Sequence, residues 1–210
     1  YLLRQHLHTT LGERLRSRPY LTMIERKWIA YQILEAVRTC HEASVYHGDI
    51  KTDNFVLTTW NWVCLTDFAS YKPVFLPDTD PSVFSYFFDS TGRRTCYLAP
   101  ERLQQRTFSA IQSTSVDSHL NAGMDVFSVG CVFVELFLDS HEPLFDLGSL
   151  RDYRDGNYDP TNVINGIEDK TIVELIRHMI QVDPKQRLSI GEYLTQYTGT
   201  IFPKEFQYVM

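Results

Sequence analysis

Residues 47–54 constrain the fold more than any other part of the sequence, because they place several phosphate-handling groups on one short stretch. Asp49 is followed two residues later by Lys51, and Asn54 stands three residues beyond that lysine. A second carboxylate, Asp67, follows thirteen residues after Asn54. A single Asp or Asn near a turn usually caps a backbone amide. Together, however, these residues supply what phosphoryl transfer needs: a base for the hydroxyl proton, a cation for the transferring charge, and oxygen ligands for magnesium.

Two short apolar runs between Asn54 and Asp67 predict a β-hairpin. The runs are Phe55–Leu57 and Trp62–Leu65, and threonines and an asparagine lie between them. Apolar runs divided by a few turn-forming polar residues are typical of paired strands. Asp67 therefore follows directly after the predicted hairpin.

Four helices are predicted from capping signals and hydrophobic periodicity. Thr22 and Glu25 have the spacing of a capping box, and apolar residues then recur at helical intervals. Residues 125–138 are apolar on nearly every side, which is typical of a buried central helix and too short for a membrane span. Thr9–Arg18 is expected to form a short first helix and Thr171–Val182 the last amphipathic helix.

The longest stretch without clear periodicity is Tyr71–Tyr97. It contains three prolines and many aromatic side chains, and we expect it to be irregular. A loop of this length inside a compact domain is usually functional. Its aromatic residues indicate that it packs against the rest of the domain. Phe108–Gly123, which is rich in serine and threonine, is expected to be a surface insertion.

Composition favours one globular domain and argues against nucleic-acid binding. The chain has 210 residues, 43% of them hydrophobic, and a formal net charge of -6 with acids and bases interspersed. No basic patch stands out, so a nucleic-acid partner is not expected. No run of about twenty apolar residues is present, so no membrane span is expected. The four cysteines lack metal-ligand spacing, and we expect them to be buried free thiols in a reducing compartment.

The motifs resemble those of protein kinases, in the order in which kinases carry them. Residues 47–54 resemble the catalytic loop H-R-D-L-K-x-x-N, and residues 67–69 resemble the D-F-G motif. Residues 99–101 match A-P-E, and residues 125–130 resemble the D-x-W-S-x-G start of the buried kinase helix. Residues 183–187 resemble the late D-P-x-x-R motif. The resemblance implies an α+β, protein-kinase-like fold, with a mainly helical C-lobe and a small β-hairpin at the catalytic loop.

The resemblance also implies a role for each matching residue. Asp49 corresponds to the catalytic base, and Lys51 to the lysine that contacts the transferring phosphate in serine/threonine kinases. Asn54 and Asp67 correspond to the ligands of Mg2+, and Val56 to the floor of the adenine pocket for ATP. The other implied roles are the nucleotide-binding hinge, Arg4, Gln5 and His6, and the structural residues His47, Glu101, Asp125 and Arg187. The arginine of the late motif pairs with the A-P-E glutamate in kinases.

Residues 47–54, 58–70 and 94–102 resemble one kinase family more closely, the vacuolar-protein-sorting serine/threonine kinases that are regulatory subunits of class III phosphatidylinositol 3-kinase. That family implies a role in autophagy and in endosomal and vacuolar sorting. The implied partners are the class III phosphatidylinositol 3-kinase catalytic subunit and a beclin-type subunit. The implied location is cytoplasmic, peripheral on endosomal, autophagic or vacuolar membranes, with the membrane bound by regions outside this chain.

The same resemblance implies a division of the chain. Residues 1–8 are expected to be the end of the small-lobe sheet and the hinge, residues 9–203 the kinase C-lobe, and residues 204–210 the start of a linker to a following region. Because the chain opens in mid-strand, we expect it to be a piece of a longer protein.

Three departures from the kinase pattern keep two hypotheses open. Gly48 replaces the arginine of H-R-D, so a phosphate on Thr91 or Thr95 lacks its usual partner. Ala69 replaces the D-F-G glycine, and a left-handed backbone costs alanine about 1–2 kcal/mol. No glycine-rich G-x-G-x-x-G loop occurs. The chain is therefore expected to be either an ATP-dependent serine/threonine protein kinase or a catalytically inactive pseudokinase scaffold that binds nucleotide and controls the lipid kinase by contact.

Overall fold

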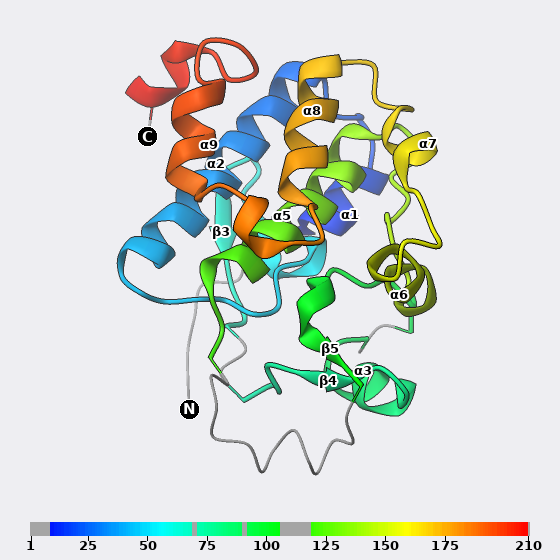
Figure 1. The fold of residues 1–210 in the computed structure, drawn as a ribbon. Coiled ribbons are helices and arrows are strands. Elements are labelled where there is room, and N and C mark those ends of the chain that lie inside the picture. The colour runs from blue at the N-terminus through cyan, green and yellow to red at the C-terminus, as the bar shows by residue number, and fades with distance from the viewer. Residues whose placement is uncertain (1–8, 69–70, 90–91, 106–118, 210) are drawn as a thin grey trace.

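The computed structural model describes four stretches of the chain: residues 9–68, 71–89, 92–105 and 119–209. These stretches form a mainly helical domain with two small sheets, in agreement with the predicted α+β class (Figure 1). Some predicted features lie outside the described residues: Arg4, Gln5 and His6 of the hinge, Ala69, Thr91 and most of the expected insertion.

Four helices build the main body: α2 (Met23–Glu42), α5 (Ala122–Phe137), α8 (Lys170–Met179) and α9 (Ile190–Tyr197). Helix α5 contacts both α2 and α8, and α9 contacts α2 (Figure 1). The predicted central helix is confirmed, since nearly every residue of α5 is buried. Gly130 permits the close approach of the chain after α8, because a Cβ there would lie only 2.7 Å from Cγ2 of Ile180.

Capping boxes set the starts of the first two helices. The predicted box at Thr22 is confirmed, since its hydroxyl accepts from the Glu25 N–H and the Glu25 side chain accepts from the Thr22 N–H. The first helix, α1 (Leu11–Arg16), is shorter than predicted and is capped by Thr10. Its predicted first residues instead form strand β1 (Thr9–Thr10), because they pair with a neighbouring strand.

The predicted hairpin is confirmed as strands β2 (Phe55–Leu57) and β3 (Val63–Leu65), which pair antiparallel with each other. Strand β1 pairs antiparallel with the other edge of β2, so β2 is the central strand of the sheet. Asn61 takes the left-handed conformation at φ 58° in the turn, which asparagine tolerates well. The Gln32 side chain of α2 donates to the Asn61 carbonyl at 2.8 Å and accepts from the Val63 N–H at 3.0 Å. These two hydrogen bonds fix the hairpin to the helical body.

The C-terminal part contains more helix than predicted. The expected helix at Thr171–Val182 is α8, but it is not the last helix, because α9 follows with its own capping box between Ser189 and Glu192. Two shorter helices in this part are α6 (Leu147–Arg154) and α7 (Thr161–Ile164). The described residues also contain the 3-10 turns η1 (Thr52–Asn54), η2 (Pro100–Arg102), η3 (Pro184–Gln186) and η4 (Lys204–Tyr208). Phe206 of η4 packs edge-on against Trp28, with 4.9 Å between ring centroids.

The prediction that Tyr71–Tyr97 is irregular is wrong in two places. Strand β4 (Leu76–Pro77) pairs parallel with β5 (Leu103–Gln104), and helix α3 (Pro81–Phe87) follows. Asp80 caps this helix and Pro81 occupies its first turn, where a missing N–H costs nothing. The expected packing of the aromatic residues is confirmed for Phe84 and Phe88, which are buried. The segment is therefore a folded layer beside the catalytic loop.

Two smaller predictions need correction. The cysteines are free, but Cys64 is exposed and Cys40 is half-buried, so only Cys96 and Cys131 are the expected buried thiols. Cys64 lies at the centre of β3, where alternate side chains point to opposite faces. The end of the expected insertion, Ala122–Gly123, belongs to α5 instead. Within the described stretches, no helix is long and apolar enough to cross a membrane.

Candidate active site

The loop of residues 47–54, named the catalytic loop for its resemblance to that of kinases, is tied to the central helix through one buried carboxylate. Asp125, in the first turn of α5, is 1% exposed. It accepts hydrogen bonds from the backbone N–H groups of His47 at 2.8 Å and Gly48 at 2.9 Å, and its Oδ2 lies 3.0 Å from His41 Nε2. A buried carboxylate needs such partners to offset its loss of hydration. Asp125 therefore fixes the loop immediately before Asp49.

His47 joins the catalytic loop to the chain that carries Asp67. Its Nδ1 accepts from the Asp49 N–H at 3.2 Å, and its Nε2 lies 2.8 Å from the Thr66 carbonyl. This pattern places the proton on Nε2, because a carbonyl only accepts. The ring also packs beside Phe68, with 4.6 Å between centroids. Both ring nitrogens are thus occupied in holding the loop.

The structure brings three of the predicted residues together at one oxygen. The Asp49 side chain is 7% exposed, and its Oδ2 accepts from Asn54 Nδ2 at 3.0 Å and lies 3.4 Å from Lys51 Nζ. The Asn54 Nδ2 also donates to the Asp49 carbonyl at 2.7 Å. Because the amide nitrogen of Asn54 is used in this way, its amide oxygen is the atom left to act as a ligand.

Asp67 lies just beyond β3 and is exposed, with its backbone in the left-handed region at φ 61°. Mg2+ prefers oxygen ligands and is commonly held by one or two protein groups together with substrate phosphates. The Asn54 amide oxygen and the Asp67 carboxylate have that chemistry. Among the described residues there is no group of three or more His, Cys, Asp or Glu side chains that would hold a metal alone. Val56, the expected adenine contact, is half-buried in β2.

Lys72 is a site residue that sequence reasoning missed. Its Nζ lies 2.7 Å from Asp49 Oδ2, closer than Lys51 or Asn54, and its side chain is only 10% exposed. It comes from the segment after the D-F-G-like motif, in a stretch without periodicity. A lone lysine in such a stretch carries no signal of its partner, so only the three-dimensional structure reveals this contact.

Arg102 was also missed, and it fastens that segment to the catalytic loop. Its guanidinium donates to the carbonyls of Gly48 at 2.6 Å, Val74 at 2.7 Å and Pro73 at 3.1 Å. Burial lowers the pKa of Arg102 to about 10, while Asp125 and Asp49 oppose this shift. The side chain is therefore still cationic at neutral pH.

The glycine that replaces the H-R-D arginine has a structural reason. Gly48 has φ 74°, a backbone conformation that side-chain-bearing residues rarely adopt. A Cβ at this position would lie 2.5 Å from Cδ1 of Leu120. An arginine would thus need both a strained backbone and a shift of the neighbouring leucine.

Glu101 and Arg187 form a bidentate pair beneath the site. The two guanidinium nitrogens lie 2.7 and 3.0 Å from the two carboxylate oxygens. Arg187 also donates to the carbonyls of Gln181, Val182 and Gly123 and stacks over the Phe127 ring. The pair connects the A-P-E-like motif to the C-terminal helices.

A buried acid lies deeper under the catalytic loop. Glu135, in α5, is 1% exposed, and burial raises its pKa to about 7, although its hydrogen bond with Tyr97 partly opposes that shift. The Tyr97 hydroxyl in turn lies 3.1 Å from the Thr52 hydroxyl, next to Lys51. This group was not anticipated from the sequence, because an acid inside an apolar helix does not show whether it is buried.

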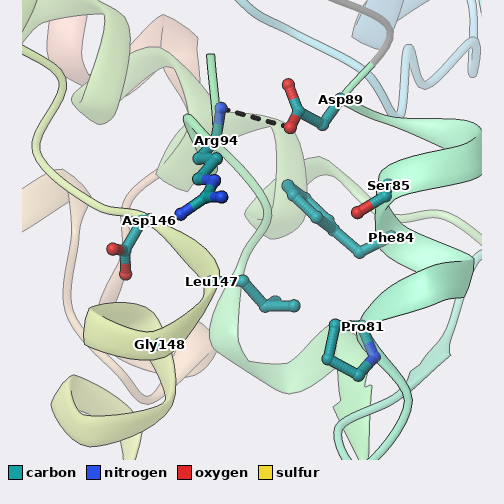
Figure 2. A pocket seen from close by; sticks show the side chains of 8 residues that line it. All are labelled: Pro81, Phe84, Ser85, Asp89, Arg94, Asp146, Leu147 and Gly148. Carbon is teal, nitrogen blue, oxygen red and sulfur yellow. Dashed lines mark hydrogen bonds between the residues drawn. The ribbon is translucent and has the colours of Figure 1, made fainter. Parts of the chain in front are cut away.

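A separate cavity of about 220 Å³ lies away from these groups. Figure 2 shows that it opens between α3 and the start of α6, with the Arg94 side chain directed towards Asp146. Its lining residues are Pro81, Phe84, Ser85, Asp89, Arg94, Asp146, Leu147 and Gly148. None of the residues with an implied catalytic role contributes to it.

Known proteins that this chain resembles are protein kinases. The family model described as "Protein kinase domain" matches residues 1–197. The chain is 48% identical over 206 residues to "Serine/threonine-protein kinase VPS15" of Arabidopsis thaliana, which covers 98% of this chain and 14% of that relative. It is 47% identical over 209 residues to "Probable serine/threonine-protein kinase vps15" of Dictyostelium discoideum, covering 99% of this chain and 10% of that relative.

A third relative extends the comparison to budding yeast. The chain is 43% identical over 209 residues to "Serine/threonine-protein kinase VPS15" of Saccharomyces cerevisiae, with 98% of this chain and 14% of the relative covered. The chain thus spans only 10–14% of the length of these three relatives. The matched part is the kinase-like region and not the remainder of those proteins.

Proposed function

The chain belongs to the protein kinase family, and on that premise we propose that it is the kinase-like domain of a regulatory subunit of a class III phosphatidylinositol 3-kinase complex. The identity of 43–48% to proteins named VPS15 supports this assignment. The proposed partners are the lipid-kinase catalytic subunit and a beclin-type subunit. The proposed role is in autophagy and in endosomal or vacuolar sorting, at the cytoplasmic face of those membranes.

One observation carries the catalytic part of the proposal. Lys51 and Asn54 both contact one buried carboxylate oxygen, Oδ2 of Asp49, and Asp67 follows the hairpin formed by β2 and β3. This arrangement supports a catalytic role, because phosphoryl transfer needs a proton acceptor with a cation beside it. Positioned proton acceptors typically contribute about a hundred- to ten-thousand-fold in rate.

Each of these residues has its own role in the proposed transfer of phosphate from ATP. The serine or threonine hydroxyl oxygen of a protein substrate bonds to the γ-phosphorus of ATP, the bond from that phosphorus to the bridging oxygen breaks, and ADP leaves. Asp49 takes the hydroxyl proton, and Lys51 neutralises charge on the transferring group. Asn54 and Asp67 are the residues that would hold Mg2+, which when bound screens the phosphate charges.

Nucleotide binding tests this proposal. The full-length protein in complex with its lipid kinase is titrated with ATP, with and without Mg2+, as the wild type and as Asp67→Ala. We expect magnesium-dependent binding that the substitution weakens strongly, because one of the two protein ligands is lost. Binding that is absent, or indifferent to Asp67, would contradict the proposed site.

A second candidate function is that of a scaffold that binds nucleotide without transferring phosphate. The contact between Lys72 and Asp49 favours it, since the proposed base is covered. Asp49→Asn separates the two functions. Loss of phosphate transfer with an intact assembly supports the enzyme, whereas loss of the assembly itself supports the scaffold.

A further inference from the structure

We propose that Lys72 is an internal occupant of the position at which a substrate hydroxyl must reach Asp49, so that the segment after the D-F-G-like motif blocks the base until Lys72 is displaced. The proposal rests on the proposed function, in which Asp49 accepts the hydroxyl proton. It adds a regulatory contact that the sequence motifs do not contain. It also explains how Asp49, Lys51 and Asn54 occur together with a covered base in the same structure.

Lys72 occupies the place at the Asp49 carboxylate that a substrate hydroxyl needs. A general base must lie within about 2.6–3.2 Å of the hydroxyl oxygen whose proton it takes. Lys72 Nζ already occupies that range, at 2.7 Å from Asp49 Oδ2. The same oxygen accepts from Asn54 at 3.0 Å and lies 3.4 Å from Lys51. A substrate hydroxyl that approaches this oxygen therefore has to replace Lys72, because Asn54 and Lys51 belong to the catalytic loop itself.

The contact between Lys72 and Asp49 is strong enough to compete with a substrate hydroxyl. Lys72 and Asp49 are 10% and 7% exposed, so water screens their attraction only weakly. Charge-assisted hydrogen bonds are about twice as strong as neutral ones. A neutral hydroxyl alone does not displace an ammonium group from such a site. Displacement needs binding energy from elsewhere on the substrate or from a partner protein.

Neighbouring groups direct Lys72 towards Asp49. Its ammonium lies 5.0 Å from the centroid of the Phe88 ring, and Phe88 is also stacked by Arg102 at 5.1 Å. Arg102 binds the carbonyls of Pro73 and Val74, which directly follow Lys72, and the carbonyl of Gly48, which directly precedes Asp49. One buried guanidinium thus fixes the distance between the two partners.

The contact between Lys72 and Asp49 can be released at low cost. Lysine binds as a point charge on a flexible chain, whereas arginine holds a carboxylate with a rigid fork. Tyr71, the residue before Lys72, is 75% exposed. When Lys72 leaves, Asp49 keeps Lys51 and Asn54 as partners. The release therefore does not leave an unpaired buried charge, which would be costly.

Lysine labelling tests whether the contact exists in solution, independently of catalysis. The full-length protein in its complex is treated with an amine-reactive acetylating reagent, and the labelling rate of each lysine is followed by mass spectrometry. We expect Lys72 to react at least tenfold more slowly than the exposed Lys185, and several-fold faster in Asp49→Asn, with Lys185 unchanged. If Lys72 reacts as fast as Lys185 in the wild type, the proposal is overturned.

Phosphate transfer tests whether the contact inhibits. Wild type, Lys72→Met, the double variant Lys72→Met/Asp49→Asn and the control Lys185→Met are incubated with ATP, Mg2+ and a mixed serine/threonine peptide library. Methionine keeps the packing on Phe88 and removes the charge. We expect Lys72→Met to transfer about tenfold more phosphate or more, and the double variant to lose this gain. An unchanged or lower rate in Lys72→Met would overturn the proposal.

Nucleotide binding is measured in the same samples, so that two failures are told apart. If ATP binds and Lys72→Met shows no gain, the inhibitory role of Lys72 is wrong while the proposed nucleotide site stands. If ATP does not bind any variant, the proposed function is wrong. The labelling experiment then still decides whether Lys72 covers Asp49, and it leaves Lys72 itself unsubstituted.

Discussion

Two ion pairs in this domain, each with one buried and one half-buried partner, are built in opposite ways. Glu101 and Arg187 meet through two parallel hydrogen bonds, and Arg187 donates to three backbone carbonyls as well. Asp49 and Lys72 meet through one short contact on a single carboxylate oxygen. The first pair joins the A-P-E-like motif to the C-terminal helices, and the second covers the proposed base.

The difference between the two ion pairs distinguishes a region that maintains the fold from a region where we propose that catalysis is controlled. A guanidinium with several fixed partners cannot leave without exposing unpaired carbonyls in a buried place. When the flexible Lys72 side chain moves away, the Asp49 carboxylate retains Asn54 and Lys51 as partners. The C-terminal body is thus expected to depend strongly on its ion pair for stability. The catalytic face is expected to depend on its ion pair for control.

The largest effect on stability is expected from Arg187→Met. The substitution leaves Glu101 without its partner and removes donors from the carbonyls of Gln181, Val182 and Gly123. Breaking a buried pair from one side costs about 3–5 kcal/mol. Thermal unfolding of the full-length protein measures the loss, with Arg177→Met as the control, because Arg177 is exposed and makes a single side-chain contact. Equal melting temperatures for the two variants would contradict the structural role.

A somewhat smaller effect is expected from Arg102→Met. Three carbonyls lose their donor, and we expect a cost of about 2–4 kcal/mol, since unmade buried hydrogen bonds cost about 1–3 kcal/mol each and do not add fully. Amide exchange should accelerate in residues 71–89 more than in α8. A uniform acceleration in both regions would show that Arg102 supports the whole domain and not this segment.

Glu135→Gln should act in the opposite direction and depend on pH. Burial raises the pKa of Glu135 from 4.5 to about 7 in the folded protein. A raised pKa in an acid means that folding favours the protonated form, so its contribution is full below 4.5 and is lost as pH rises through 7. Glutamine resembles the protonated acid, so it should stabilise by about 1–3 kcal/mol at pH 8.

The pH profile is the check on that prediction. Thermal unfolding is compared for wild type and Glu135→Gln at pH 8, 6.5 and 5, and the stabilising difference should shrink as pH falls. A difference that is constant with pH would mean that Glu135 does not titrate in this range. Glu174→Gln is a suitable control, because Glu174 is exposed on α8.

The smallest effect on stability is expected from Lys72→Met. Asp49 keeps two partners, so we expect a change of no more than about 1 kcal/mol, compared with the larger cost of breaking a pair whose partner is orphaned. The melting temperature of the full-length protein should therefore remain near that of the wild type. A loss as large as that of Arg187→Met would show that Lys72 is a structural residue, and the contrast between the two ion pairs would disappear.

Local patterns predicted the parts of the fold that follow from neighbouring residues. The capping box at Thr22, the hairpin around Asn61 and the all-apolar α5 each carry their signal within a few positions. Helix α3 was missed, although Asp80 followed by Pro81 is a start signal, because the surrounding prolines and aromatic residues favoured an irregular segment. Helix α9 was also missed, despite the capping box of Ser189 and Glu192.

In the candidate site, too, the residues that are close together in the sequence were predicted and the distant ones were missed. Asp49, Lys51 and Asn54 lie within six positions, and the structure places them at one oxygen. Lys72 and Arg102 reach the catalytic loop from 23 and 54 positions away. Contacts over such separations depend on how the segment after Asp67 folds back, and no local spacing encodes that path.

The most direct test of the account is a structure of the full-length protein in its complex, with Lys72→Met, Mg2+ and a non-hydrolysable ATP analogue. We predict a metal ion bound by the Asn54 amide oxygen and the Asp67 carboxylate at about 2.0–2.1 Å. We also predict that the Asp49 carboxylate faces the γ-phosphate with no cation other than Lys51 beside it. A nucleotide bound without these two ligands, or an Asp49 turned away from the phosphate, would contradict the claim that this loop is built for phosphoryl transfer.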